Sequence, residues 1–348
     1  MLRLLAVVFV ASFYQQAAKL YAQDDGEIRA VLFGSRLDKT EHAMLDQTLK
    51  LPKDLFLFLG DNIYADTSDM HVMKQKYNAL KSSRFFQTLR QQTTILATWD
   101  DHDFGPNDGA ADFTKRRESQ QQFLDWLDVP NDSPRRSQAG VYSSKTLGPR
   151  DRRVQIVLLD TRYFRSPLKK GEHTIVPSGG SYVSNYDPEA TVLGDEQWRW
   201  LEERLSEPAR LRLIVSSIQF IPTAHGGECW ANFPRERQRM LDLIHQTKAS
   251  GVVFLSGDRH WCEFSRMEGP NDYSLFDFTA SSMTQVHPRG SPTPNSLRLI
   301  PKTYHNPNVG RLNIDWKPVD PQLQFQILDE RGEVQLEYSL RLSELYPK

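Results

Sequence analysis

The sequence predicts an α/β fold whose central sheet carries charged groups at the carboxyl ends of its strands. Short apolar runs of the kind that form buried strands recur along the chain, and four of them end within a residue or two in a polar cluster. These runs with their clusters are 55–59 with Gly60-Asp61-Asn62-Ile63-Tyr64, 95–99 with Asp100-Asp101-His102-Asp103, 154–159 with Asp160-Thr161-Arg162-Tyr163, and 252–256 with Gly257-Asp258-Arg259-His260. Ligands of α/β folds bind at this edge of the sheet, so the clusters form the candidate site.

Helical spacing of apolar residues predicts five helices between the strands. In the first of them, Met44, Leu45 and Leu49 form one buried stripe. The five predicted helices cover 42–50, 70–89, 116–127, 193–205 and 234–248.

Further strands are predicted from alternation and from turn residues. Leu323, Phe325 and Ile327 alternate with glutamines and precede the turn 329–332, which predicts a hairpin with 334–340. A Gly-Pro turn predicts a second β pair between 141–145 and 153–160. The remaining predicted strands are 27–33, 94–98 and 211–216.

Two segments rich in Gly, Ser and Pro, 167–189 and 287–296, are predicted to be long surface loops. Such loops either contact a substrate or simply connect elements. Because no linker divides the chain, one domain over 23–348 is expected.

Composition limits the classes of protein to consider. With 25% charged and 39% hydrophobic residues over 348 residues, the chain has an ordinary globular composition. The formal net charge of −1 gives no general attraction to nucleic acid or to an anionic membrane, so no stable nucleic-acid complex is expected.

The N-terminus has the pattern of a secretory signal. Arg3 precedes a short apolar run, 4–11, which is followed by polar residues. A signal peptide over 1–22 is therefore predicted, and with it export to the exterior, the periplasm or an organelle lumen, with no membrane span after cleavage. A buried N-terminal element and an uncleaved anchor remain the alternatives.

The chain has two cysteines, Cys229 and Cys262, which export would allow to pair. Two buried free thiols are the alternative. The absence of a Cys-x-x-Cys motif excludes a cysteine zinc site.

The polar clusters combine carboxylates with imidazoles, which are ligands for hard or borderline metal ions. Asp100, Asp101 and Asp103 repel one another around His102 unless a cation lies among them. The clusters therefore predict a metal-dependent hydrolase.

Taken together, these motifs resemble the calcineurin-like metallophosphoesterases and, within them, the PhoD-like alkaline phosphatases. Supporting matches are Leu193-Gly194-Asp195-Glu196-Gln197-Trp198 and Phe233-Pro234-Arg235-Glu236-Arg237. The resemblance implies a four-layer α/β/β/α sandwich with a two-metal centre. It implies that Asp61 bridges the metals, Tyr64 binds a ferric ion, Asp101 binds the second metal, Asp258 and His260 complete the site, and His102 is the catalytic imidazole.

One position departs from the family pattern. The first strand ends in Gly34-Ser35-Arg36, where PhoD-like enzymes have Gly-Ser-Cys with an iron-binding thiolate. An arginine stays protonated and cannot bind a metal ion. This disfavours Fe³⁺ and favours Ca²⁺, with Mg²⁺ or Mn²⁺ as alternatives. Arg36 would then contact the substrate phosphate, or mark a protein that has lost catalysis.

The predicted reaction is hydrolysis of a small phosphomonoester or phosphodiester by metal-activated water. Arg162, with Arg165 and Arg36 as further contacts, would meet the phosphate charge. His102 would protonate the leaving oxygen, Asp103 would orient its ring, and His225 would contact the site. For Arg162, a structural ion pair with Asp160 or Asp195 is the alternative. For the protein as a whole, the alternative to an enzyme is a catalytically silent phosphate- or ligand-binding scaffold.

Overall fold

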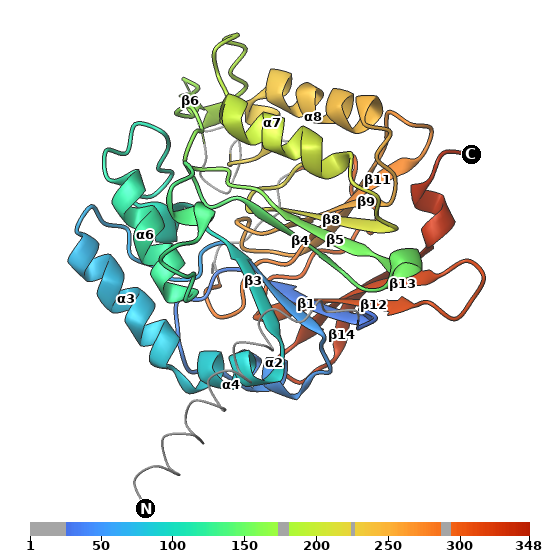
Figure 1. The fold of residues 1–348 in the computed structure, drawn as a ribbon, viewed down its shortest axis with the longest axis horizontal. Helices are drawn as coiled ribbons and strands as arrows, with labels where there is room; N and C mark the ends of the chain where they lie inside the picture. Colours follow the sequence, from blue (N-terminus) through green and yellow to red (C-terminus); the bar gives the residue numbers. More distant parts are fainter. Residues whose placement is uncertain (1–25, 173–180, 224–226, 287–293) are drawn as a thin grey trace, which may run out of the picture.

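Two six-stranded mixed sheets lie face to face in the computed structural model, which describes residues 26–172, 181–223, 227–286 and 294–348 (Figure 1). The first sheet has the strand order β14 (Val334–Arg341), β13 (Gln322–Asp329), β12 (Asn308–Asp315), β1 (Ala30–Gly34), β2 (Leu55–Leu59), β3 (Thr94–Thr98). The second has the order β10 (Glu263–Glu268), β11 (Ser274–Thr279), β9 (Val252–Ser256), β8 (Leu211–Ser216), β5 (Val154–Leu158), β4 (Ser143–Leu147).

The continuous apolar runs reflect strands that are buried on both faces. In β2, Leu55, Leu57 and Leu59 belong to the core between the two sheets, whereas Phe56 and Phe58 pack against helices on the outer side. Neither face reaches solvent, so the alternation of a half-exposed strand is missing from the sequence.

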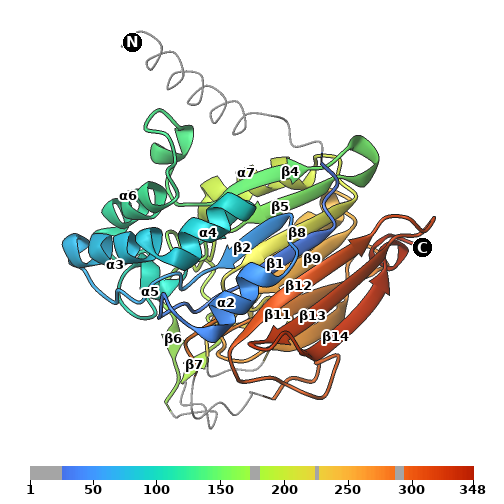
Figure 2. The ribbon, with the colours of Figure 1, turned by 90° about the horizontal axis from the view of Figure 1, so that it is seen from below.

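Helices cover the outer faces and complete the predicted α/β/β/α layers (Figures 1 and 2). The apolar faces of the two helices on the second sheet join its core, through Trp198 and Met240 for example. The helices on the first sheet are α2 (Ala43–Lys50), α3 (Met70–Ser82), α4 (Arg84–Gln92) and α6 (Arg116–Trp126), and those on the second are α7 (Gly194–Leu205) and α8 (Pro234–Gln246).

Several predicted elements are confirmed, and some boundaries differ. The helix expected over 70–89 is two helices, because Ser83 breaks the first and caps the second by accepting a hydrogen bond from the Phe86 amide at 3.2 Å. The described part of the loop expected over 167–189 contains the short strands β6 (Lys169–Lys170) and β7 (Tyr182–Val183). The sequence did not predict β10, β11, β12 or the short helix α5 (Asp101–Phe104).

The carboxyl ends of the two sheets are joined by hydrogen bonds, and this joint carries the polar clusters. Thr98, which ends β3, donates its hydroxyl to the Leu159 carbonyl after β5 at 2.6 Å. Ser217, which follows β8, donates to the Asp100 carboxylate at 2.5 Å, and its carbonyl accepts from the Gly257 amide at 3.0 Å. The loops of both sheets therefore form one continuous edge.

Cys229 and Cys262 are both buried and form no disulfide, which agrees with the second of the two expected alternatives. Among the residues that the structure describes, no helix has the length and apolar character needed to cross a bilayer. The predicted signal at 1–22 lies outside the described residues.

Candidate metal centre

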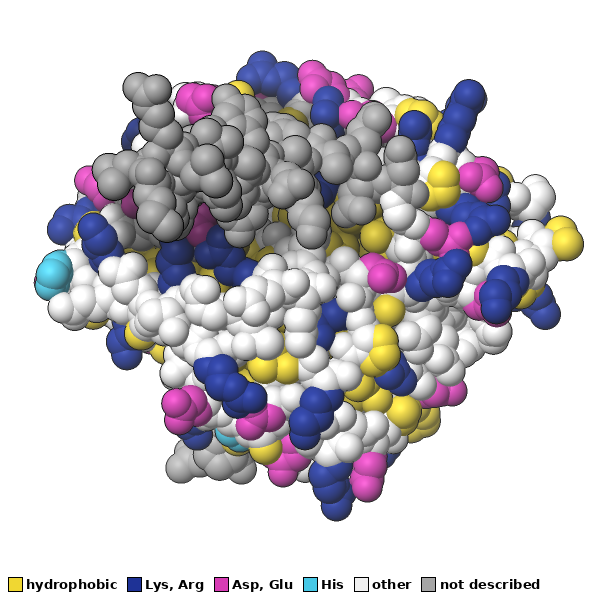
Figure 3. All heavy atoms as spheres, turned by 60° about the horizontal axis from the view of Figure 1, so that its bottom comes forward, with side chains coloured by type: hydrophobic (Ala, Val, Ile, Leu, Met, Phe, Trp, Pro, Cys, Tyr) yellow, Lys and Arg dark blue, Asp and Glu magenta, His cyan; other side chains and the backbone are white. Residues whose placement is uncertain are grey.

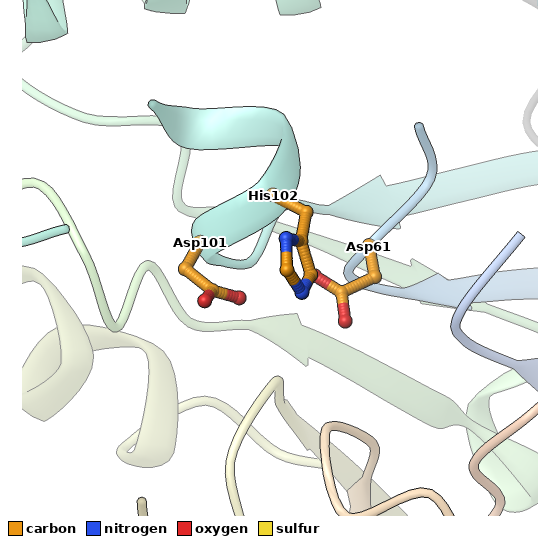
Figure 4. Close-up of side chains that lie close together, drawn as sticks. All are labelled: Asp61, Asp101 and His102. Atoms are coloured by element: carbon orange, nitrogen blue, oxygen red, sulfur yellow. The ribbon is translucent and has the colours of Figure 1, made fainter. Parts of the chain in front are cut away.

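Asp61, Asp101 and His102 converge at the joined edge, each offering one ligand atom within 4.8 Å of the others (Figure 4). Asp61 follows β2, whereas Asp101 and His102 open α5, whose first turn is fixed by a capping box between Asp100 and Asp103. Burial alone would raise the pKa of Asp101, but the charges of Arg162 and His102 outweigh it and hold that pKa below its usual range. Asp101 is thus an ionised, buried oxygen donor.

Four residues of the site enter it from backbone in the left-handed region. The φ angles of Arg36, Asp61, Asp258 and His260 are 63°, 52°, 62° and 63°. Residues other than glycine rarely adopt this conformation, and it persists only where surrounding structure enforces it. The conformations of these loops therefore direct the four side chains into the site.

His102 is oriented by Asp66 and not by Asp103, which corrects the prediction. The Nδ1 atom of His102 lies 2.6 Å from Asp66 Oδ1, and the ring stacks on Tyr64 with centroids 4.2 Å apart. Burial lowers the pKa of His102, but the hydrogen bond to Asp66 and the nearby carboxylates raise it more, to about 9.

Asp103 points away from His102 because it holds the loops after β2 and β3 together. Its carboxylate accepts hydrogen bonds from the Asp100 amide at 2.7 Å and from the Asn62 side chain at 2.5 Å, and it lies 3.4 Å from the Tyr77 hydroxyl. Asp103 is fully buried, and burial raises its pKa to about 7. Its contacts are those of a positioning residue.

The guanidinium of Arg36 lies inside the site. Nη1 is 2.8 Å from Asp61 Oδ2 and 3.5 Å from Asp258 Oδ1, and it donates to the Asp258 carbonyl at 2.6 Å. Nη2 is 3.5 Å from His102 Nε2, and the guanidinium carbon is 5.5 Å from the centre of the Tyr64 ring. Arg36 is only 2% exposed, so its charge is committed to these groups.

Arg162 and Arg165 lie behind the convergent ligands in a buried ionic network. Arg162 is fully buried and contacts Asp100 at 2.5 Å and both oxygens of Glu228, while Arg165 pairs with Glu228 at 2.8 Å. The side-chain partners of Arg162 are therefore neither Asp160, which accepts its amide at 2.9 Å, nor Asp195. The predicted contact of Arg162 with substrate stays a prediction.

A second group of possible ligands, Asp100, Asp101 and Glu228, shares Asp101 with the first. All three carboxylates pair with Arg162, Asp101 at the longer distance of 3.8 Å, so the charge of the group is partly compensated without a metal ion. This group fits a metal ion less well than the first.

The remaining predicted ligands lie near the site without joining a convergent group. Among the described Asp, Glu, His and Cys residues, neither Asp258 nor His260 belongs to such a group. The His260 amide donates to Ser281 Oγ at 2.9 Å. The Tyr64 hydroxyl is buried and accepts or donates no hydrogen bond within the described chain. His225 lies outside the described residues.

Sequence reasoning missed the roles of Asp66, Asp100 and Glu228. Asp100 was visible as part of an acidic cluster, but its contact with Arg162 spans 62 residues. Asp66 and Glu228 sit in loops without a motif, and only the folded loops bring them to His102 and Arg162.

The donors present fit one metal ion better than two. Asp61 Oδ1 and Asp101 Oδ1 are buried and make no hydrogen bond within the described structure, which suits a hard cation between them, whereas Asp61 Oδ2 is paired with Arg36. The second position of the expected centre, among Asp61, Tyr64 and Asp258, holds the Arg36 guanidinium. A second metal ion there would have to displace that side chain.

Facing mixed sheets with an acidic and imidazole centre at their joined strand ends define a metallophosphoesterase-like fold. The profile of the PhoD-like phosphatase family matches residues 33–343, so the chain belongs to that family.

Individual relatives agree with this assignment. Alkaline phosphatase D of Bacillus subtilis (strain 168) is 26% identical over 246 residues, which are 60% of this chain but only 41% of that relative. A solved structure of PhoD has a TM-score of 0.72 at 17% identity, covering 92% of this chain and 71% of that one. GAP50, the anchor in the inner membrane complex of Plasmodium, has a TM-score of 0.56 at 10% identity, covering 91% and 89%. At these identities the structural matches establish a shared fold.

Proposed function

We propose that this protein hydrolyses phosphate esters, either phosphomonoesters or phosphodiesters, with water activated by a divalent cation. The observation that carries the proposal is the convergence of Asp61, Asp101 and His102, in which Asp61 Oδ1 and Asp101 Oδ1 are buried and have no hydrogen-bond partner among the described residues. Membership of the PhoD-like phosphatase family supports the same reaction class. A second metal ion, as in the two-metal mechanism that the resemblance implies, finds less support because Arg36 lies at its position.

The side chains around that cation would have different roles. A bound divalent cation would lower the pKa of water and polarise a phosphoryl oxygen. Asp61 and Asp101 are the residues to hold it. His102 has Nδ1 engaged by Asp66, so Nε2 is the atom that would donate a proton to the leaving oxygen. The cation near Asp61 and Asp101 would also lower the pKa of His102 from its high value toward the working range.

The proposed substrate is a small phosphate ester. A hollow of about 400 Å³ opens beside Tyr64, and its volume suits a small molecule. Its lining includes Lys39 and Lys76 as well as the acidic Asp38 and Glu41. Ca²⁺, Mg²⁺ and Mn²⁺ are the proposed cations because the donors are mostly oxygens.

Export and the absence of a nucleic-acid partner belong to the same proposal. On the face seen in Figure 3, basic and acidic side chains are interspersed, in keeping with a formal net charge of −1. Such a surface does not favour binding of a polyanion such as nucleic acid.

The apolar N-terminal pattern supports export.

The test is hydrolysis of an aryl phosphate and an aryl phosphodiester by the full chain, before and after chelation. We expect turnover that is lost with a chelator, restored by one of the three cations, and reduced at least roughly 10²-fold by Asp61→Asn. Asp46→Asn, an exposed carboxylate on α2, is the matched control and should leave the rate unchanged. No turnover with any cation would favour the catalytically silent scaffold.

A further inference from the structure

The Arg36 guanidinium lies among the predicted metal ligands themselves, within 3.5 Å of Asp61, Asp258 and His102. Its neighbours are the Asp61 and Asp258 carboxylates, the Asp258 carbonyl, the His102 ring and the Tyr64 ring. Apart from the face of the Tyr64 ring, these are oxygen and nitrogen atoms of the kind that otherwise surround a cation. The guanidinium is thus coordinated as an ion would be.

The backbone shows that this placement is built into the fold. Arg36 has a φ of 63°, which costs a non-glycine residue free energy, and the turn is held by backbone hydrogen bonds. The amides of Thr284 and Gln285 both donate to the Arg36 carbonyl at 3.1 Å, and the Leu37 amide donates to the Asp61 carbonyl at 2.9 Å. The side chain therefore leaves a fixed turn and is directed at Asp61 and Asp258.

The ion pair between Arg36 and Asp61 has an unusual feature. The two atoms are 2.8 Å apart, yet neither Asp61 oxygen has a partner with hydrogen-bond geometry in the described structure. Asp61 therefore pairs with Arg36 through Oδ2 and also belongs to the convergent group with Asp101 and His102.

We propose that the Arg36 guanidinium is a permanent cation of this centre, which takes one of two cation positions and leaves a single exchangeable site for a divalent metal at Asp61 and Asp101. This goes beyond the proposed reaction, since it concerns the ion content of the protein whether or not an ester is hydrolysed. A guanidinium cannot exchange, deprotonate or bind water as a metal ion does, so the two positions are chemically unequal.

Counting bound metal tests the proposal directly. The full-length protein is stripped with a chelator, dialysed to equilibrium against Mn²⁺, and assayed for metal per chain by mass spectrometry. We expect one ion for the native chain, two for Arg36→Gly, and one for Arg36→Lys, which keeps the positive charge. Glycine adopts the required φ freely, so Arg36→Gly removes the side chain without adding backbone strain.

A second readout does not depend on stoichiometry. Without its guanidinium, the Arg36→Gly variant leaves Asp61 and Asp258 uncompensated, so added Mn²⁺ should raise its melting temperature by more than that of the native chain. Methylguanidinium should compete with the second ion in this variant and not affect the native protein. Two ions of similar affinity in the native chain, or a folded Arg36→Gly that gains none, would overturn the proposal.

The hydrolysis assay separates this proposal from the proposed function. One ion per native chain without turnover would support the fixed cation and overturn the enzyme. Turnover together with two ions bound per native chain would support the enzyme and overturn the fixed cation.

Discussion

At the residue scale, the Asp66 and His102 pair sets the charge state of the imidazole. Asp66 has a φ of 45°, which asparagine tolerates well, so Asp66→Asn keeps the turn and removes only the charge. The pair therefore offers a clean test of how the site controls a proton.

The pKa of His102 is raised to about 9 in the metal-free protein, so its stabilising effect is full below about pH 6.5 and is lost as the pH rises through 9. Asp66→Asn should therefore lower the unfolding free energy by roughly 1 kcal/mol near pH 6 and by much less near pH 10. Urea unfolding at both pH values, with NMR titration of the imidazole, measures this. Equal losses at both pH values would contradict it, and Asp46→Asn is the control.

Arg162 provides a second prediction at this scale. Because it is fully buried and pairs with Asp100 and Glu228, Arg162→Gln should lower the unfolding free energy by roughly 3–5 kcal/mol, in addition to any effect on activity. Chemical denaturation of both proteins is the measurement. Lost turnover at unchanged stability would instead support direct contact between Arg162 and substrate.

Sequence motifs located most of the site but not the contacts between its members. Asp61, Asp101 and His102 follow strand ends, and the edge of a sheet brings such residues together. Which carboxylate orients His102 depends on two loop conformations, since Asp103 is nearer in sequence but is turned inward by Asn62 and Asp100.

At the element scale, the turn after β2 determines how Asp61 enters the site. Gly60 has a φ of 107°, and a Cβ there would lie 2.7 Å from Asp100 Cβ and 3.0 Å from Ser217 Cβ. The turn passes so close to both neighbouring loops that no side chain fits.

Gly60→Ala should therefore destabilise the protein by a few kcal/mol and weaken binding of a divalent cation, because Asp61 must shift. Gly332→Ala is the matched control. Its φ of 82° is also positive, but a Cβ there would meet the flexible Gln47 side chain, so only about 1 kcal/mol should be lost. Thermal unfolding and calorimetric Mn²⁺ titration compare the two, and equal losses would contradict the steric argument.

The strands missed from the sequence share a physical reason. In β11 the buried Asp277 accepts hydrogen bonds from the Phe220 and Ile221 amides and from Ser256, so a charged residue occupies an interior position. In β12, Gly310 makes room for the Phe33 ring of β1, which lies within 2.6 Å of any added Cβ. These polar and glycine residues interrupt the apolar pattern of a strand, and only tertiary contacts explain why they are there.

At the scale of the whole molecule, the two sheets are held together by apolar contacts that involve none of the predicted metal ligands. Phe278 of β11 and Phe325 of β13 stack between the sheets with ring centroids 3.7 Å apart, and both are fully buried. The stability of the sandwich and the composition of the site should therefore be separable.

Phe325→Ala should lower the unfolding free energy by about 3–5 kcal/mol while leaving the number of bound metal ions unchanged. Denaturant unfolding and metal analysis of the same preparation measure both. Val334→Ala, at an exposed position of β14, should stay within about 0.5 kcal/mol of the native protein. Loss of metal in folded Phe325→Ala would show that the stability of the sandwich and metal binding at the site are coupled.

The hydrogen bonds that join the two sheets have a consequence for how the protein is made. Asp100 and Ser217 are 117 residues apart, and Arg36 and Asp258 are 222 apart. During synthesis the first half of the chain presents Asp61 and Asp101 without their later partners, and no complete centre exists until β9 has left the ribosome and docked. The nascent chain therefore carries its acidic loops without their partners for much of its synthesis, and the centre depends on contacts between distant segments, which form slowly in folding.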